Sequence, residues 1–78
     1  MKYFIVVGYT AETKYYLHVK DATGSLRFTT DIHLATIFDE PMLNLLLEEI
    51  KDEASYMHIY DLRPAKISIK EYKTIWKS

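Results

Sequence analysis

The stretch PMLNLLLEEIKDEA at residues 41–54 decides the fold of this chain. Its apolar residues recur mostly three or four positions apart, the spacing that gathers side chains on one face of an α-helix. That face consists of Leu43, Leu46, Leu47, Ile50 and Ala54. The opposite face carries Asn44, Glu48, Lys51 and Asp52. The sequence therefore predicts an amphipathic helix over residues 41–54 that packs its leucine-rich face across a sheet.

The residues before this helix fit a helix start. Residues 39–41 read Asp-Glu-Pro, in which the acids favour the positive end of the helix dipole and the proline suits a first turn. Farther upstream, Thr30 or Asp31 can accept hydrogen bonds from the free amides of another first turn. We therefore expect a second, shorter helix over residues 31–38.

Three strands are expected before these helices. Residues 2–9 are β-branched or aromatic and apolar on both sides, which is typical of a strand in the middle of a sheet. Residues 14–20 alternate in polarity and predict a strand with one buried face. The connections at residues 10–13 and 21–24 suit hairpin loops, and a third strand follows at 25–29.

A fourth strand is expected after the main helix. Residues 56–62 alternate between apolar and polar side chains. Arg63 and Pro64 follow, and we expect them to break the strand, because proline cannot donate to a β-ladder. Residues 65–69 form a candidate fifth strand.

The last segment, residues 70–76, fits two structures. Ser68 and Glu71 match a capping box, which favours a helix. The same residues alternate well enough for a strand. We favour the helix and keep the strand as the alternative.

The order of elements predicts an α+β fold. An antiparallel β-meander is joined by a fourth and a candidate fifth strand, and the one main amphipathic helix packs on one face. A right-handed crossover would place the fourth strand beside and parallel to the first, which makes the first strand central. Gly8, inside that strand, indicates a bulge or a close backbone approach, of which we favour the bulge.

The composition is that of a small globular protein. The chain has 78 residues, of which 49% are apolar and 27% charged, and this predicts a single domain over residues 1–78. Cysteine is absent, which excludes disulfides and thiolate metal ligands. The apolar N-terminal run is too short to cross a membrane, so we expect no membrane partner and take the cytoplasm as the default location.

Charge is separated along the chain, although the net charge is only −1. Residues 39–53 hold six acids and one lysine, whereas residues 63–78 hold five bases and one glutamate. The net acidity argues against general affinity for nucleic acid. The separation can be satisfied within the molecule, with the tail against the helix, or between copies in a homodimer joined at a sheet edge.

Part of the chain resembles a group of known proteins. Residues 16–17 (Tyr-Leu) are followed by FTTDI at 28–32, and then by Ala35 and Phe38 before the amphipathic helix. This arrangement resembles small proteins encoded by phages and prophages of low-GC Gram-positive bacteria, in which a hairpin ends in a Thr-Asp helix start. The resemblance implies a viral accessory role, and its motif contains no catalytic residue.

Candidate metal and catalytic residues are few. The histidines are His18, His33 and His58, and none stands four residues from another. The acidic face of the predicted helix carries Glu48, Glu49, Asp52 and Glu53. Such acids can bind magnesium or transfer protons, but these lie on a polar helix face, where burial does not shift a pKa. We therefore expect that the chain is not an enzyme and that it holds no cofactor and no metal.

Tyrosine is unusually frequent, with seven residues. Large rings with a polar tip are favoured at protein interfaces and equally in ordinary strands. The second face of the sheet is either offered to a partner or covered by Tyr72 and Trp76 of the tail. The candidate interaction face consists of Tyr16, His18, Tyr56 and Tyr60.

These features predict a non-enzymatic protein that binds another protein. The acidic helix face would steer it towards a basic partner. The alternative is single-stranded nucleic-acid binding, in which bases stack on strand tyrosines and the lysines of the C-terminal tail contact phosphates. The net acidity makes nucleic acid the weaker alternative.

Overall fold

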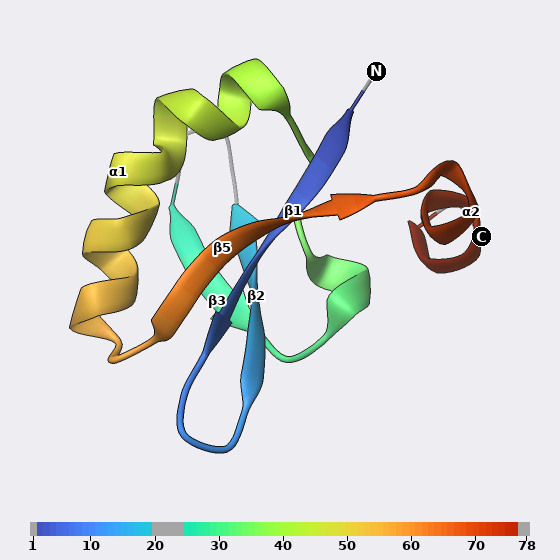
Figure 1. Cartoon of the computed structure of the whole chain (residues 1–78). Coiled ribbons are helices and arrows are strands. Elements are labelled where there is room, and N and C mark those ends of the chain that lie inside the picture. Colours follow the sequence, from blue (N-terminus) through green and yellow to red (C-terminus); the bar gives the residue numbers. More distant parts are fainter. Residues whose placement is uncertain (1, 20–24, 77–78) are drawn as a thin grey trace.

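A computed structural model describes residues 2–19 and 25–76 (Figure 1). The elements in chain order are β1 (Tyr3–Tyr9), β2 (Lys14–Val19), β3 (Leu26–Thr29), the 3₁₀ helix η1 (Ile32–Leu34), β4 (Phe38–Asp39), α1 (Glu40–Tyr56), β5 (Tyr60–Ile67), α2 (Ile69–Glu71) and the π-helical turn η2 (Tyr72–Trp76). The strands form one five-stranded sheet and α1 is the main helix, so the predicted α+β fold is confirmed. Lys20 and the predicted loop at 21–24 lie outside the described residues.

β1 is the middle strand of the sheet. β5 pairs with it antiparallel from Tyr3 to Tyr9, and so occupies one of its edges. The other edge is shared, because β2 pairs with the second half of β1 and β4 with its first two residues. β3 pairs with the far side of β2. The predicted central position of the N-terminal strand is therefore confirmed.

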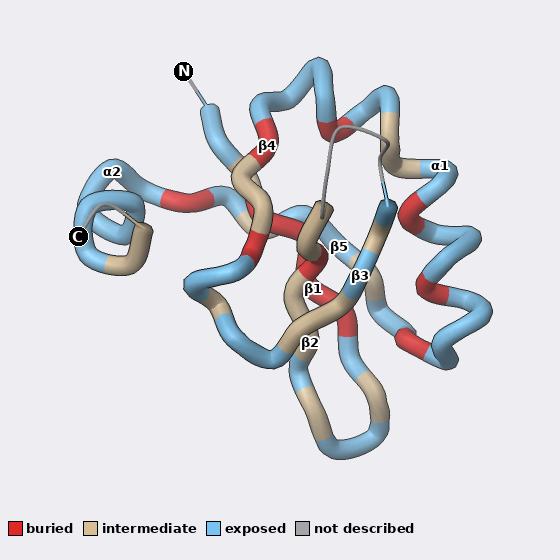
Figure 2. The backbone as a smooth tube through the Cα atoms, turned by 180° about the vertical axis from the view of Figure 1, so that it is seen from behind, coloured by how far each residue is buried: buried red, intermediate tan, exposed pale blue. Residues whose placement is uncertain are grey.

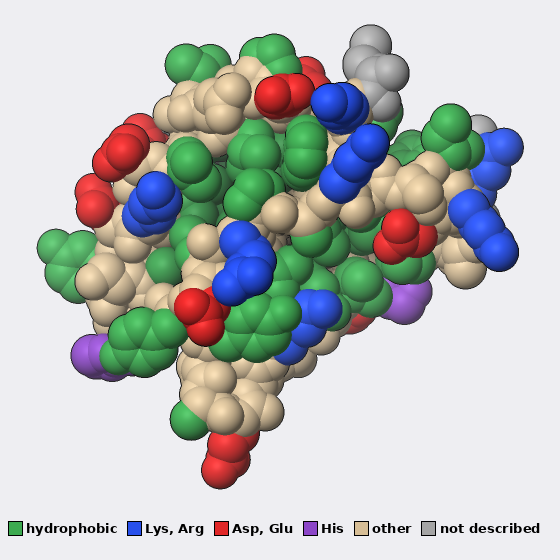
Figure 3. Space-filling model, in the orientation of Figure 1, with side chains coloured by type: hydrophobic (Ala, Val, Ile, Leu, Met, Phe, Trp, Pro, Cys, Tyr) green, Lys and Arg blue, Asp and Glu red, His purple; other side chains and the backbone are tan. Residues whose placement is uncertain are grey.

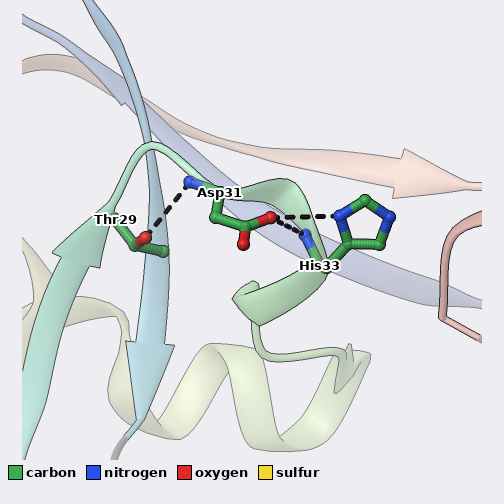
Figure 4. A network of polar contacts seen from close by, with 3 residues as sticks. All are labelled: Thr29, Asp31 and His33. Atoms are coloured by element: carbon green, nitrogen blue, oxygen red, sulfur yellow. Dashed lines mark hydrogen bonds and ion pairs between the residues drawn. The ribbon is translucent and has the colours of Figure 1, made fainter.

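A polar network forms the only helical turn within residues 31–38, where a longer helix was expected. The Asp31 carboxylate accepts the backbone N–H of His33 at 2.9 Å and lies 3.0 Å from Nδ1 of the same residue (Figure 4). The Asp31 N–H in turn donates to Oγ1 of Thr29 at 3.1 Å. The backbone hydrogen bond from His33, and then its ring contact, hold the pKa of Asp31 below its ordinary value. The result is the short helix η1, which ends at Leu34.

The rest of the predicted 31–38 helix is wrong, because the chain there is extended between β1 and β2. The N–H of Thr36 donates to the carbonyl of Leu17 at 2.9 Å, and Oγ1 of Thr36 accepts the N–H of Val19 at 2.8 Å. Phe38 then pairs opposite Phe4 of β1. Thr36 thus bonds to β2, and Phe38 and Asp39 pair with β1. The segment fills the gap where β1 and β2 separate.

β4, α1 and β5 form a β-α-β unit with β1 between its two strands. β4 and β5 lie on opposite edges of β1 and are both antiparallel to it, so they run parallel to each other. The prediction that the strand after the helix is parallel to β1 is wrong. β4 was not predicted from the sequence. Because β4 runs antiparallel to β1, the crossover through α1 places β5 antiparallel to β1 as well.

The start of α1 lies at the Asp-Glu-Pro segment, where the sequence predicts it. Asp39 caps the helix, since its Oδ1 accepts the N–H of Met42 at 2.9 Å, and Glu40 and Pro41 occupy the first turn. The helix begins at Glu40, one residue before the predicted boundary. A side-chain oxygen at this position satisfies one of the free amides of the first turn.

The end of α1 lies two residues beyond the predicted Ala54. The N–H of Ile59 donates to the carbonyl of Ala54 at 2.9 Å, and that of His58 to Ser55 at 3.2 Å, the two bonds of a Schellman motif. His58 has a φ of 57°, in the left-handed region. The predicted strand at 56–62 is therefore wrong in its first half, because Tyr56 belongs to the helix and β5 begins at Tyr60.

The backbone of His58 provides a stability prediction. Glycine adopts a left-handed φ without the steric penalty of a Cβ atom, so His58→Gly is expected to raise the free energy of unfolding by about 0.5–1 kcal/mol. Urea denaturation followed by circular dichroism measures this. His58→Ala keeps the Cβ atom and is the control. Equal stability of the two variants would contradict the explanation.

β5 continues through Arg63 and Pro64 to Ile67, so the predicted break and the separate strand at 65–69 are wrong. Pro64 stands opposite Val6 of β1. Within residues 2–19 and 25–76, β5 pairs only with β1 and is an edge strand. An edge strand tolerates proline because its outer row of N–H groups needs no partner in the sheet.

The bulge that we favoured at Gly8 is confirmed, although the additional residue lies on the partner strand β5. The pairing of β1 with β5 shifts between Val7 and Tyr9, where β5 carries an additional residue, and Asp61 has a φ of 53°. Side chains, rather than backbone, lie close to Gly8, since an added Cβ atom would overlap Cγ2 of Ile59 and lie 3.2 Å from Cδ1 of Leu62, whereas the carbonyl oxygen of Tyr60 would be 3.8 Å away. The bulge is on β5, and Gly8 faces it.

Gly8→Ala is therefore expected to lower the free energy of unfolding by about 1–3 kcal/mol through overpacking against Ile59. Thermal and urea denaturation measure the change. In the double variant Gly8→Ala/Ile59→Ala the added methyl has room, so the two changes should cost less together than their sum. Strict additivity would show that the contact with Ile59 is not the cause.

Two clusters of buried side chains lie on opposite faces of the sheet. The helix-side cluster consists of Val6, Leu17, Phe38, Leu43 and Ile50. The tail-side cluster consists of Ile5, Val7, Ala35 and Ile67. α1 covers the first, and Figure 2 shows its buried residues recurring along one side of the helix. Figure 1 shows α2 and the C-terminal end of the described chain on the other side of the sheet from α1.

The C-terminal segment is helical, as we favoured. Ser68 and Glu71 form the predicted capping box, in which each backbone N–H donates to the other side chain at 3.1 Å. Trp76 then packs against the tail-side cluster. The tail thus covers part of the second sheet face and leaves part of it exposed.

Candidate functional site

A groove of about 900 Å³ separates α1 from the edge strand β3. Its lining comes from two walls: Ser25, Leu26, Arg27 and Phe28 on the β3 side, and Glu49, Asp52, Glu53, Tyr56 and Met57 on the α1 side. Figure 2 shows β3 at the margin of the sheet on the side of α1. The groove therefore lies between a charged helix flank and a strand edge that has no strand partner among the described residues.

Helix and strand periodicity create this lining. Residues 49, 53 and 56 follow the spacing of one flank of a helix, next to the buried stripe through Ile50 and Ala54. Leu26 and Phe28 are two residues apart in β3, so both point to the helix side, where they pack half-buried against the helix-side cluster. The result is an apolar floor beside an acidic wall.

The acidic wall has no cationic partner among the described residues. The only ion pair within residues 2–19 and 25–76 joins Asp31 and His33, which lie outside α1. Glu49, Asp52 and Glu53 are all exposed, and Arg27 is the one base among the described residues of the lining. Among the described residues, therefore, no ion pair compensates the negative charge of this wall, which favours a basic ligand.

The predicted acidic face is only partly in the groove. All four of its acids are exposed, but Glu48 does not line the groove. Of the two alternatives for satisfying the separated charge, contact of the C-terminal tail with these acids is not found in the described residues, because α1 and α2 lie on opposite sides of the sheet (Figure 1).

The structure divides the predicted interaction face among three places. Tyr16 and Tyr60 lie on the tail-side face of the sheet, opposite Val7 and Tyr9 of β1. His18 is tied to η1, since its Nδ1 is 2.8 Å from the carbonyl oxygen of Leu34 and must donate the proton of that bond. Tyr56 is 83% exposed and lines the groove.

The exposed part of the tail-side face carries a second surface, the tyrosine patch, which consists of Tyr9, Lys14, Tyr16, Tyr60 and Arg63. Tyr9 stands opposite both Lys14 and Tyr60, and Val7 opposite both Tyr16 and Arg63, and opposed residues in a sheet share a face. Nζ of Lys14 lies 5.5 Å from the centre of the Tyr16 ring. Figure 3 shows basic and hydrophobic side chains side by side over β5 and the hairpin end of β1.

Sequence reasoning missed Tyr9, Lys14 and Arg63 in this patch. A usable signal was present for two of them, because Tyr9 and Lys14 flank the predicted hairpin loop and residues flanking such a loop face each other. Arg63 could not be placed, since it was assigned to a break between strands.

A second hollow, of about 390 Å³, lies where the tail meets the sheet. It is lined by Tyr3, Ile37, Ile67, Ser68, Ile69 and Tyr72. Hydroxyls are the polar side-chain groups of these six residues, and none of the six is an acid, a base or a histidine. A hollow of this composition offers apolar contact and no acid–base chemistry.

No polar or charged residue in the described part of the chain is buried, and no group of three or more His, Asp or Glu side chains there is placed to hold a metal ion. His18 lies in β2, His33 in η1 and His58 in the turn between α1 and β5.

No helix of the described residues combines the length and the apolar character needed to cross a membrane. Comparisons with protein-family models, with curated proteins and with solved structures each found no match to this chain. The case for function therefore rests on the surfaces described above.

Proposed function

We propose that this chain is a non-enzymatic protein-binding module, and that it binds a basic segment of another protein in the groove between α1 and β3. The observation that carries the proposal is the acidic wall of Glu49, Asp52 and Glu53, which forms no ion pair with the described residues, beside the apolar floor of Leu26 and Phe28. A protein interface combines an apolar centre with a polar rim in this way. Complementary charge would add rate and specificity to the association.

The resemblance to phage- and prophage-encoded proteins extends this proposal. On that basis the chain is a viral accessory protein that acts in the cytoplasm by occupying a surface of a host protein. The absence of buried charged groups in the described residues is in keeping with binding rather than catalysis, because catalytic groups usually depend on burial or close partners.

Site-specific photocrosslinking tests the proposed function. A photoreactive phenylalanine analogue replaces Tyr56, which lines the groove, or Leu45, which is 81% exposed on the same helix but outside the groove. Each protein is irradiated in nuclease-treated lysate of a low-GC Gram-positive bacterium. We expect one protein to be crosslinked from position 56 and not from position 45, through a peptide rich in lysine or arginine.

The charge of the acidic wall provides the control. The crosslink should be abolished in the triple variant Glu49→Gln/Asp52→Asn/Glu53→Gln. It should stay intact in Glu48→Gln, because Glu48 does not line the groove. Equal crosslinking from positions 56 and 45, or a crosslink that survives the triple substitution, would contradict a groove that selects a basic partner.

The tyrosine patch supports single-stranded nucleic-acid binding as a second candidate. Tyr60 is 62% exposed and Tyr9 37%, with Lys14 and Arg63 on the same face, so bases could stack while the cations meet phosphates. Fluorescence anisotropy with labelled oligothymidine checks this at 50 and 200 mM salt. The candidate predicts binding that weakens with salt and is lost in Tyr9→Ala/Tyr60→Ala. Binding unaffected by these substitutions would remove it.

A further inference from the structure

We infer that the partner segment binds in an extended conformation, as an additional β-strand on the free edge of β3, and that it carries lysine or arginine at every second position. This inference rests on the proposed function and specifies the form of the ligand. It follows from three properties of the groove: the strand edge, the floor and the position of the acids.

The two outer edges of the sheet are not equivalent. β5 contains Pro64 and the bulge at Asp61, and both interrupt the regular row of backbone groups that a further strand would need. β3 contains neither, and its residues Leu26–Thr29 pair in unbroken register with β2. Within the described residues β3 has no partner on its other edge. Addition of a strand is therefore blocked at β5 and open at β3.

The groove determines which side chains an added strand would carry. Alternate side chains of that strand would point to the helix side, as Leu26 and Phe28 do. There they meet apolar surface below and the carboxylates of Glu49, Asp52 and Glu53 above. Lysine and arginine fit both, because their aliphatic stems cover apolar area while the charged ends reach the acids. The remaining side chains face away from α1, on the side of Arg27.

The acids are spaced for this arrangement. Residues 49 and 53 are one helical turn apart, about 5.4–6 Å along the axis. Alternate residues of a strand are about 6.6–6.8 Å apart. Successive basic side chains of a strand laid along α1 can therefore each approach a different carboxylate. A helical ligand would match neither the strand edge nor this spacing.

Binding of short synthetic peptides tests the inference. Fluorescein-labelled TKTKTKT alternates threonine, a good strand former, with lysine. TTTKKKT has the same composition without alternation, and TKPKPKT has the same charge but lacks two backbone donors. In anisotropy titrations we expect TKTKTKT to bind about tenfold more tightly than either control, a difference of about 1.4 kcal/mol. Its affinity should fall about tenfold or more in Glu49→Gln/Asp52→Asn/Glu53→Gln and stay unchanged in Glu48→Gln.

The outcomes separate this inference from the proposed function. Equal binding of all three peptides, with loss in the triple variant, would overturn strand addition and leave a basic ligand in the groove. Absence of peptide binding, with a crosslink from position 56, would overturn the inference alone. Sedimentation at the same concentrations detects a second copy of this chain on β3. A dimer that TKTKTKT does not dissociate would overturn the inference in favour of self-association.

Discussion

Phe38→Ala is expected to lower the free energy of unfolding by about 3–5 kcal/mol. Phe38 is completely buried at the centre of the helix-side cluster, where β4 closes the gap between β1 and β2. Truncation removes a ring from contact with the strands and leaves a cavity that two sheet edges and a helix would have to fill. Small domains have a total stability of about 5–15 kcal/mol, so the variant would lose a large part of it.

Urea denaturation followed at 222 nm measures this loss. Phe38→Leu is the graded control, since it keeps most of the buried volume and should cost well under half as much. Leu34→Ala, at a residue that is 51% exposed, should change stability by about 0.5 kcal/mol or less. A loss below about 1 kcal/mol in Phe38→Ala would show that Phe38 does not hold this central position.

Ile50→Ala is expected to cost about 2–4 kcal/mol, the second largest effect. Ile50 is the fully buried residue of α1, and the helix reaches the sheet through it and Leu43. The loss should weaken the attachment of the whole helix. Amide hydrogen exchange should therefore show faster opening along α1 than along β1 and β2.

Leu45→Ala is the matched control for Ile50→Ala. It removes a similar side chain from the same helix, but Leu45 is 81% exposed. Alanine has the highest helix propensity, so stability should be unchanged or slightly higher. Equal losses at positions 45 and 50 would mean that α1 does not pack on the sheet with the face described here.

Elements set by local signals could be predicted from the sequence. The main helix was found because its apolar period and the Asp-Glu-Pro start at residues 39–41 lie within the helix and its flank. The capping box of Ser68 and Glu71 is equally local and placed the C-terminal helix. The hairpin at residues 10–13 forms as expected, with the N–H of Thr10 donating to the carbonyl of Thr13.

Elements set by distant contacts could not be predicted. The spacing of Leu34, Ala35 and Phe38 is helical, but Thr36 and Phe38 bond to strands that precede them by many residues. Pro64 looks like a strand breaker until β5 is known to be an edge. Tyr56 alternates with its neighbours as in a strand, whereas the Schellman motif at His58 keeps it in the helix.

The candidate site, too, combines features set by local sequence with features set by distant contacts. The exposure of Glu49, Asp52 and Glu53 followed from helical periodicity. Their position across a groove from β3 required the packing of α1 on the sheet, which no local pattern contains. For the same reason Tyr16 and Tyr56 were grouped on one predicted face, although they lie on surfaces of different elements.

The central claim is that a basic, extended segment binds along β3, beneath the acidic flank of α1. The most direct measurement is an isotope-filtered NOE spectrum of the labelled chain with unlabelled TKTKTKT. We predict cross-peaks between peptide Hα protons and the backbone protons of Leu26–Thr29, together with contacts from lysine side chains to Tyr56. Cross-peaks confined to Tyr9 and Tyr60, or to residues of β5, would contradict the account.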